Sequence, residues 1–502
     1  SWLPPPSPVG EGRGEGPAPD HRPRTKRPCQ IEGAARGAEA PSSAARPSDI
    51  AIIGLAGIFP GAADARTFWE NTLRGVDVIT EVPPDRWDWR LYYDPDPKAP
   101  DKITSKWGGF LPDIPFDPLR YGMPPASLPS IEPTQLLVLE AARIALEDAG
   151  YAERPFPRER TAVVLGMGGG AAQLAMGYAF RSYLPMLDAV APGAGRRVRE
   201  RAEALLPEWT EDSFPGFLLN VTAGRVANRF DLGGANYTVD AACGSSLAAA
   251  ALAVRELETG AADLVILGGA DTVQNPFTYL AFSKTQAFSP RGRCRPFDAS
   301  ADGIVISEGI GVVILKRLAD AERDGDRIYA VIKGIGCSSD GRARGLTAPC
   351  GEGQTRALAR AYEKAGIDPS TIGYFEAHGT GTAVGDVVEV NALSAFLRAA
   401  GAAPGSSVIG SVKSLIGHTK CAAGLAGLIN ATWALYHRIL PPTIGVERLN
   451  PKADLHDGPL HVGTRARPWL HAADRPRRAG VSAFGFGGTN FHAVLEAYER
   501  DP

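Results

Sequence analysis

Cysteine is scarce in this chain: there are six in 502 residues, and no two of them form a CxxC pair. That usage argues against a disulfide framework and a zinc site, and it favours a reducing cytoplasm as the location. The sequence also lacks an apolar run long enough to span a bilayer and a recognisable signal peptide. The net charge is only −3, which argues against a general nucleic-acid-binding protein.

The composition that remains is typical of a globular enzyme, with 44% apolar and 22% charged residues. Residues 1–48 differ, because they are rich in Pro, Gly, Ala, Ser and Arg and have almost no apolar periodicity. Such a stretch cannot bury enough surface to offset its ordering entropy, so we predict a disordered linker. The chain begins with Ser1 rather than Met, which suggests a piece of a longer polypeptide.

From Asp49 onward, continuous apolar runs alternate with helical patterns. This alternation predicts an α/β protein with mainly parallel sheets covered on both faces. One series of strand-like runs ends near residue 320, and a second begins near residue 327. We therefore expect an N-terminal half over 49–320, with an insertion at about 171–212, and a C-terminal half over 327–500. Strands are expected near residues 49–56, 161–166, 263–269, 311–315, 327–333, 373–377, 407–412 and 493–496.

Cys243 lies between a short apolar stretch and an Ala-rich helical pattern, in Tyr237-Thr-Val-Asp-Ala-Ala-Cys243-Gly-Ser-Ser-Leu. A helix N-terminus carries partial positive charge and unpaired N–H groups. Both stabilise a thiolate, so we expect a lowered thiol pKa and a nucleophilic cysteine. The alternative is a buried structural cysteine.

Two histidines stand at similar junctions further along the chain. His378 follows an apolar strand in Phe375-Glu-Ala-His378-Gly-Thr-Gly-Thr, and His418 opens an Ala/Gly-rich helix after Lys413-Ser-Leu-Ile-Gly. Strand ends in α/β folds are where such groups converge. One cysteine and two histidines at strand ends favour nucleophilic thiol chemistry over three separate structural roles. The two Ala-rich helices, each preceded by a strand, also suggest an internal repeat.

These three motifs, together with Ser482-Ala-Phe-Gly-Phe486-Gly-Gly-Thr-Asn490, resemble the active-site motifs of β-ketoacyl synthases. The resemblance runs from about Asp49 to about Tyr498. It implies a thiolase-like fold, which is a duplicated five-layer αβαβα arrangement with two mostly parallel-stranded sheets. A more specific resemblance is to the ketosynthases of polyunsaturated fatty acid synthases and of iterative type I polyketide synthases. This chain differs from many of them in having Gly244, where they have alanine.

The resemblance also implies an acyltransferase of the 3-oxoacyl-acyl-carrier-protein synthase type. Cys243 would take an acyl group from a thioester, and a malonyl thioester would then lose CO₂ and attack it in a Claisen condensation. His378 and His418 would stabilise the enolate. Lys413 would be the family's active-site lysine, paired with the carboxylate of Glu389; an ordinary structural ion pair is the alternative.

The remaining site residues come from the same resemblance. Thr347, Thr380 and Thr382 would bind the phosphopantetheine arm, although local turn bonding explains them equally well. Phe486 would be the gate that admits the acyl chain, and Asn490 would brace its loop. The backbone N–H groups of Cys243 and of Gly485, Gly487 and Gly488 would form an oxyanion hole.

We expect no cofactor or metal bound by this domain itself, because the substrates are carried on the 4′-phosphopantetheine of an acyl carrier protein. The expected partners are that carrier protein, neighbouring synthase domains and a second copy of the chain, with the two-fold interface at Asn236–Val239. Two alternatives remain: a member that transfers acyl groups without elongation, and a thiolase-like enzyme acting on CoA thioesters. The first lacks the cysteine or a histidine, and the second usually has another cysteine at the second histidine's place.

Overall fold

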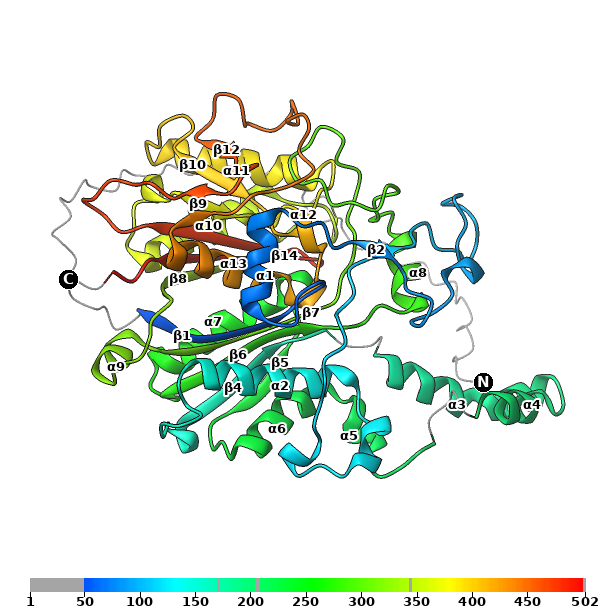
Figure 1. Ribbon diagram of the computed structural model, residues 1–502. Helices are drawn as coiled ribbons and strands as arrows, with labels where there is room; N and C mark the ends of the chain where they lie inside the picture. Colours follow the sequence, from blue (N-terminus) through cyan, green and yellow to red (C-terminus); the bar gives the residue numbers. More distant parts are fainter. Residues whose placement is uncertain (1–48, 169–171, 204–207, 343–344, 500–502) are drawn as a thin grey trace, which may run out of the picture. The chain divides into compact units, whose positions relative to one another are not determined.

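The computed structural model describes residues 49–168, 172–203, 208–342 and 345–499 (Figure 1). The predicted linker over 1–48 lies outside the described residues. The strands are β1 (Ile50–Ile58), β2 (Thr80–Glu81), β3 (Trp107–Gly108), β4 (Thr161–Gly166), β5 (Asn236–Val239), β6 (Leu264–Asp271), β7 (Gly309–Arg317), β8 (Ala330–Ser339), β9 (Tyr374–Glu376), β10 (Ser407–Gly410), β11 (Ile439–Leu440), β12 (Leu460–Val462), β13 (Arg467–Pro468), β14 (Arg478–Gly485) and β15 (Thr489–Glu496).

Helices connect most of these strands. The α-helices are α1 (Ala65–Arg74), α2 (Pro133–Asp148), α3 (Gln173–Val190), α4 (Ala194–Ala202), α5 (Ser213–Phe217), α6 (Leu219–Phe230), α7 (Ser245–Glu258), α8 (Pro276–Lys284), α9 (Leu318–Arg323), α10 (Gly351–Ala365), α11 (Gly385–Ala399), α12 (Lys413–Ile416) and α13 (Ala423–His437). The 3₁₀ turns are η1 (Trp89–Leu91), η2 (Leu119–Tyr121), η3 (Pro125–Ser130), η4 (Arg158–Arg160), η5 (Ala242–Gly244), η6 (Pro369–Thr371) and η7 (Lys420–Ala422).

Strand order reveals a duplication. The main sheet runs β12-β10-β9-β14-β15-β8-β1-β7-β6-β4-β5. In the first half, numbering the five main-sheet strands in chain order gives the spatial order 3-2-4-5-1. The second half repeats this order as β10-β9-β14-β15-β8 and has one additional strand, β12, at its outer edge. The internal repeat suggested by the two Ala-rich helices is therefore present in the topology.

The two halves of the sheet are joined where β1 pairs with β8 over three residues, Ile50 to Ile52 opposite Ile332 to Ala330. Parallel pairing holds in the outer parts of the sheet, among β4, β5 and β6 and among β9, β10, β12 and β14. The strands between them pair antiparallel. The thiolase-like α/β fold is confirmed, with antiparallel strands at its centre and with its two sheets joined edge to edge.

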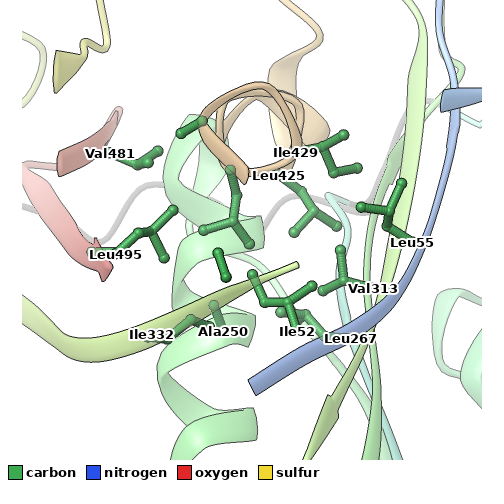
Figure 2. Close-up of a cluster of buried hydrophobic side chains, with 14 of the residues drawn as sticks. Ile52, Leu55, Ala250, Leu267, Val313, Ile332, Leu425, Ile429, Val481 and Leu495 are labelled. Atoms are coloured by element: carbon green, nitrogen blue, oxygen red, sulfur yellow. The ribbon is translucent and has the colours of Figure 1, made fainter. Parts of the chain in front are cut away.

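Helices cover the sheet on its outer faces and fill the space between its halves. α2 and α6 pack on the first half, and α10 and α11 on the second. The Ala-rich helices α7 and α13 lie in the middle (Figure 2). There Leu425 and Ile429 of α13 meet Leu267 and Val313 of the first half and Val481 of the second. This order gives the five αβαβα layers.

Small residues make this central layer possible. At Gly269 of β6, an added Cβ would lie 2.6 Å from the Ser246 side chain of α7. At Gly427 of α13, it would lie 2.9 Å from the Glu376 side chain of β9. This close packing of helices on strands places the N-terminal end of α7 beside η7, the 3₁₀ turn that leads into α13. The segments that contain α7 and η7 each come after a strand of a parallel pair.

The insertion predicted at about 171–212 contains α3 and α4, with residues 171 and 204–207 outside the described part. Glu132 holds the start of α3, because its two carboxylate oxygens accept the N–H groups of Gln173 at 2.7 Å and Leu174 at 3.0 Å. Among the described helices, none combines the length and the apolar character that a membrane crossing needs.

Candidate active site

The turn that carries Cys243 is tightly built. After β5, Ala242 takes a left-handed conformation with φ of 51°, which costs a non-glycine residue about 1–2 kcal/mol. Asp240 accepts the Ala242 N–H at 2.9 Å, and the Ser245 hydroxyl donates to the Ala242 carbonyl at 2.6 Å. These bonds stabilise the strained backbone and hold Cys243 in η5, directly before α7.

The thiol of Cys243 is half-buried, and burial raises its pKa to about 11. Lys413 and, more weakly, Lys420 act in the opposite direction, and Asp271 adds to the rise. The predicted fall in the pKa of Cys243 was therefore wrong. The loss of water around the sulfur outweighs the partial charge of a helix that begins only at Ser245. The Cys243 thiol is therefore protonated at neutral pH.

His378 and His418 face each other with ring centroids 5.5 Å apart and planes at 85°. His378 Nδ1 accepts the N–H of Phe484 at 3.3 Å, and His418 Nδ1 accepts the N–H of Lys420 at 3.1 Å. Burial, with the nearby charge of Lys413, holds the pKa of both rings well below the usual 6.5. Both imidazoles are therefore neutral at pH 7, and because Nδ1 accepts, the proton of each is on Nε2.

Lys413 is buried at the start of α12, and the loss of hydration lowers its pKa. The charges of Glu376 and Glu389 counteract that shift, with Glu376 the larger. Among the described residues, Lys413 makes no direct ion pair with Glu389. The two act on each other only through space, so the predicted Lys413–Glu389 pair is corrected to a longer-range interaction.

Glu389 instead holds the backbone of the histidine loop. Its carboxylate accepts the N–H groups of His378 at 2.7 Å and Gly379 at 2.8 Å. One turn earlier on α11, Asp386 accepts the next two, from Thr380 at 3.2 Å and Gly381 at 3.1 Å. Four consecutive N–H groups are thus bound by two carboxylates at i and i+3 of one helix, which fixes where His378 points.

If the chain catalyses the condensation that the resemblance implies, replacing Glu389 by alanine is expected to lower its rate by about 10- to 100-fold, as when a group that orients a metal-bound imidazole is lost. Two buried N–H groups beside His378 would lose their acceptor. The turnover of the purified variant is compared with that of Glu363→Ala, which removes an exposed glutamate of α10. Turnover within twofold of wild type would contradict this role for Glu389.

The glycine-rich segment near the nucleophile is the turn between β14 and β15. An added Cβ at Gly485 would lie 2.1 Å from the Ala241 carbonyl oxygen, so the hairpin packs directly on the cysteine turn. The N–H groups of Gly487 and Gly488 donate to the carbonyls of Leu346 and Gly485. They are therefore already bonded. The N–H of Phe486, with that of Cys243, is the better candidate for an oxyanion hole.

Phe486 stands at the tip of this hairpin, 45% exposed, with its ring 6.4 Å from that of Phe282 in α8. Asn490 donates to the Asp340 carboxylate at 2.7 Å, and the Asp340 N–H donates to the Gly488 carbonyl at 2.7 Å. The hairpin tip is thus attached to its surroundings through its glycines, whereas the Phe486 side chain projects outward.

The three threonines are placed differently. Thr380 is buried and its hydroxyl lies 3.2 Å from that of Thr382. The Thr382 hydroxyl also accepts the N–H of Gly385 at 3.2 Å, which is local turn bonding at the start of α11. Thr347 is exposed, next to Leu346 of the loop that binds the hairpin.

Sequence reasoning missed the roles of the buried charges around the site, although several of them lie inside the motifs. Glu376 is enclosed on β9, where it accepts from Tyr374 at 2.5 Å, from Asn430 at 2.8 Å and from the N–H of Val412 at 2.8 Å. Lys420 and Asp271 form a buried ion pair beside His418. An acidic residue within an otherwise apolar strand, as at Glu376, was the available signal. Within the described residues, no cluster of His, Cys, Asp and Glu is arranged to hold a metal ion.

Three family models match this chain. They are the beta-ketoacyl synthase N-terminal domain over residues 47–321, the beta-ketoacyl synthase C-terminal domain over 329–447, and the ketoacyl-synthetase C-terminal extension over 450–502.

Similar proteins are much longer. A polyunsaturated fatty acid synthase subunit from Thraustochytrium sp. is 43% identical over 466 residues, which cover 90% of this chain and 16% of that protein. Polyketide synthase PksN of Bacillus subtilis is 39% identical, with 90% of this chain and 8% of that protein covered. The chain therefore spans less than a fifth of the length of these two relatives.

Solved structures agree. A ketosynthase from module 6 of the bacillaene synthase of Bacillus subtilis 168 matches with a TM-score of 0.77 and 35% identity, covering 90% of this chain and 72% of that one. The oxazolomycin ketosynthase domain OzmH KS7 of Streptomyces albus JA3453 matches with a TM-score of 0.78 and 36% identity, covering 90% and 76%.

Proposed function

Because this chain belongs to the β-ketoacyl synthase family, whose members are acyl-transferring condensing enzymes, we propose that it is the ketosynthase domain of a larger synthase that makes a polyunsaturated fatty acid or a polyketide. The observation that carries the residue roles is the pair of neutral imidazoles, each with Nδ1 bonded to a backbone N–H and Nε2–H free to donate. That arrangement suits stabilisation of an enolate oxygen.

In the first half-reaction, the sulfur of Cys243 attacks the carbonyl carbon of an acyl thioester. The new S–C bond replaces the bond to the carrier thiol, which leaves with the proton that Cys243 gave up. The N–H groups of Cys243 and Phe486 would stabilise the oxyanion. Lys413 favours the thiolate electrostatically, since its charge lowers the pKa of Cys243.

In the second half-reaction, a malonyl thioester loses CO₂, and the electron pair of the broken C–C bond forms an enolate. The Nε2–H groups of His378 and His418 would donate to the enolate oxygen. The α-carbon then attacks the acyl carbonyl on Cys243, and the sulfur leaves as a thiolate that recovers a proton. Neutral donors suit this step because decarboxylation needs no strong base.

The acyl and malonyl groups would arrive on the 4′-phosphopantetheine of an acyl carrier protein. Thr347, Thr380 and Thr382 remain our candidates for binding that arm, beside the gate residue Phe486. The Thr382 hydroxyl accepts the Gly385 N–H, which supports a turn role for Thr382. Thr347 is the most exposed of the three threonines. A cytoplasmic location is part of the proposal, because the nucleophile needs a free thiol.

A non-elongating acyltransferase and a thiolase-like enzyme for CoA esters are the alternatives. The presence of both histidines with the same tautomer argues against the first, since transfer alone has no use for an enolate site. The second is disfavoured because the place of a thiolase's second cysteine is taken by His418.

The test is a reconstituted assay with purified domain, acyl-loaded carrier protein and malonyl carrier protein. Mass spectrometry of the carrier-bound product and release of CO₂ are followed together. A β-ketoacyl carrier with one CO₂ released per product supports the proposal. Acyl exchange between carriers without CO₂ release would support the transfer-only alternative instead, and extension of free acyl-CoA without carrier protein would support the thiolase-like one.

We also infer that two copies of the chain associate through β5. Among the described strands, β5 pairs only with β4, so its other edge has no partner within one copy. An unpaired edge strand is a template for pairing with another chain, and a two-fold axis would let β5 pair with itself.

Thr238→Pro is expected to convert the dimer to a monomer. The carbonyl of Ala235 accepts the N–H of Val163 in β4, and that of Val239 accepts the N–H of Met167 just after β4. By alternation the N–H of Thr238 points to the free edge. Proline would remove that donor without touching the β4 ladder, and Thr238→Val keeps it. Size-exclusion chromatography with light scattering gives the mass of each. A wild-type monomer, or a dimeric Thr238→Pro, would contradict this interface.

The boundaries at 49–320 and 327–500 are retained as our proposal for the two halves. The repeated strand order supports it, because β7 closes the first series and β8 opens the second.

A further inference from the structure

Lys420 is a second buried lysine beside the active site, and the mechanism proposed above does not use it. It is only 6% exposed, and its backbone is left-handed with φ of 49°. Burying an ammonium is costly unless it is paired, and a left-handed backbone conformation is strained for a non-glycine residue. Both costs imply that something specific holds Lys420 in place.

The side chain of Lys420 is bonded on two sides. Its Nζ donates to the Ser307 carbonyl oxygen at 2.7 Å and lies 3.2 Å from Asp271 Oδ1 at the end of β6. Asp271 is itself oriented, because the same oxygen accepts the Val273 N–H at 3.0 Å. The ammonium therefore ties η7 to two segments of the first half of the chain.

Those contacts close around His418. The His418 N–H donates to the Val305 carbonyl at 2.7 Å, and the Ser307 N–H donates to the His418 carbonyl at 2.9 Å. The Lys420 N–H donates to His418 Nδ1 at 3.1 Å. The segment 305–307 thus holds the backbone of His418 and, through Lys420 Nζ, the turn whose amide fixes the ring.

We propose that Lys420, anchored by Asp271 and the Ser307 carbonyl, is a positioning residue that fixes the tautomer and orientation of His418. The inference rests on the proposed condensing function and deepens it. Asp271 also lines a small cavity with Thr134 and Met167. The ion pair therefore connects the wall of that cavity to the imidazole that would serve the enolate.

The charged and titratable groups around His418 determine the pKa of its ring and so the pH dependence of condensation. They comprise Lys413 of α12, Lys420 of η7, the neutral ring of His378 after β9, Asp271 of β6 and Glu308 before β7. Lys413 and Lys420 both lower the pKa of His418 in addition to burial. Removing the Lys420 charge raises that pKa. Because condensation needs neutral His418, the acid limb of its pH profile should then move to higher pH.

The experiment compares Lys420→Met, Lys420→Arg and Asp271→Asn in the two half-reactions. Cys243 loading is followed by intact-protein mass, and condensation by carrier-bound product across pH. Lys333→Met is the matched control, because Lys333 of β8 is an equally buried lysine, 7% exposed and 2.6 Å from its ion-pair partner Asp49.

We expect Lys420→Met to load Cys243 within about threefold of wild type, but to lose about 10- to 100-fold in condensation, with the acid limb shifted upward. Lys420→Arg should recover most of the rate and the wild-type limb. Asp271→Asn, which keeps the ammonium but loses its carboxylate, should also lose condensation selectively.

Condensation within twofold of wild type in Lys420→Met, or equal losses in both half-reactions, would overturn the proposal. If Lys420→Met does not fold, Asp271→Asn decides, and wild-type condensation in that variant overturns it. Failure of the wild-type protein itself to condense would instead refute the proposed function, so the two failures are distinguishable.

Discussion

Replacing Cys243 by alanine is expected to abolish acyl loading and condensation together. The sulfur forms the only covalent bond to the acyl group in the proposed mechanism, so loss of the nucleophile should lower the rate by about 10⁶-fold, as for a serine nucleophile. The fold should survive, because the thiol is half-buried and alanine fits the same turn. Loading is measured by intact-protein mass after incubation with acyl carrier protein.

The matched control is Cys337→Ala, which removes another half-buried thiol, on β8 and outside the site. It should load and condense as wild type does. An acyl adduct on the Cys243→Ala protein with undiminished condensation would show that a different residue is the nucleophile.

Replacing either histidine by alanine is expected to separate the two half-reactions. In His378→Ala and His418→Ala, Cys243 should still be loaded, whereas condensation should fall by about 10²- to 10³-fold, as when an oxyanion donor is lost. His418→Gln places an amide N–H near the position of Nε2 and should recover part of the rate. Partial rescue is expected only if the group acts as a donor rather than as a base.

The pH dependence follows from the same geometry. The pKa of both rings lies well below 6.5, because burial and Lys413 disfavour the charged imidazoles. Since neutral rings are required, titration of the two rings should leave condensation unchanged down through pH 6.5 and lower it only further below. An acid limb near 7 would belong to Glu389, because burial raises the pKa of that carboxyl to about 7. His437→Gln, which alters a histidine stacked on Trp69 and Trp433, is the control and should leave the profile unchanged. An acid limb centred at 6.5 in wild type, or equal loss of loading in the histidine variants, would contradict this account.

The parts of the site that could be predicted from sequence are those carried by local pattern. Cys243, His378 and His418 each follow a strand and precede a turn, and in a duplicated fold those strand ends meet at one place. The structure brings the two histidines within 5.5 Å of each other, ring to ring. The order of the strands also follows from the repeat that the two Ala-rich helices indicated.

What sequence could not give was the balance between opposing physical effects. The position of Cys243 before a helix predicts a low pKa, yet burial raises it to about 11, and burial depends on packing from distant segments. The motif predicts that Glu389 pairs with Lys413. In the structure its two carboxylate oxygens instead accept the N–H groups of His378 and Gly379. Short-range pattern places a side chain on an element; it does not state which of two available partners it will bind.

The roles of Lys420 and Glu376 could not be assigned from sequence, because short-range pattern does not identify their partners. The partners of Lys420 are Asp271 and Ser307, and a partner of Glu376 is Asn430. These partners lie 54 to 149 residues away along the chain, and those of Lys420 belong to its first half. A buried charge between apolar neighbours signals such a partner without identifying it.

Peptide-level mass spectrometry of the wild-type enzyme, stopped between the two half-reactions, shows whether Cys243 carries the acyl group that is later condensed. The domain is incubated with acyl carrier protein, digested and mapped, and a parallel sample receives malonyl carrier protein before digestion. We predict an acyl group on the peptide that contains Cys243, and its disappearance with equal gain of β-ketoacyl carrier once malonyl carrier is added. An acyl group on any other peptide, or an adduct at Cys243 that malonyl carrier leaves in place, would contradict the account.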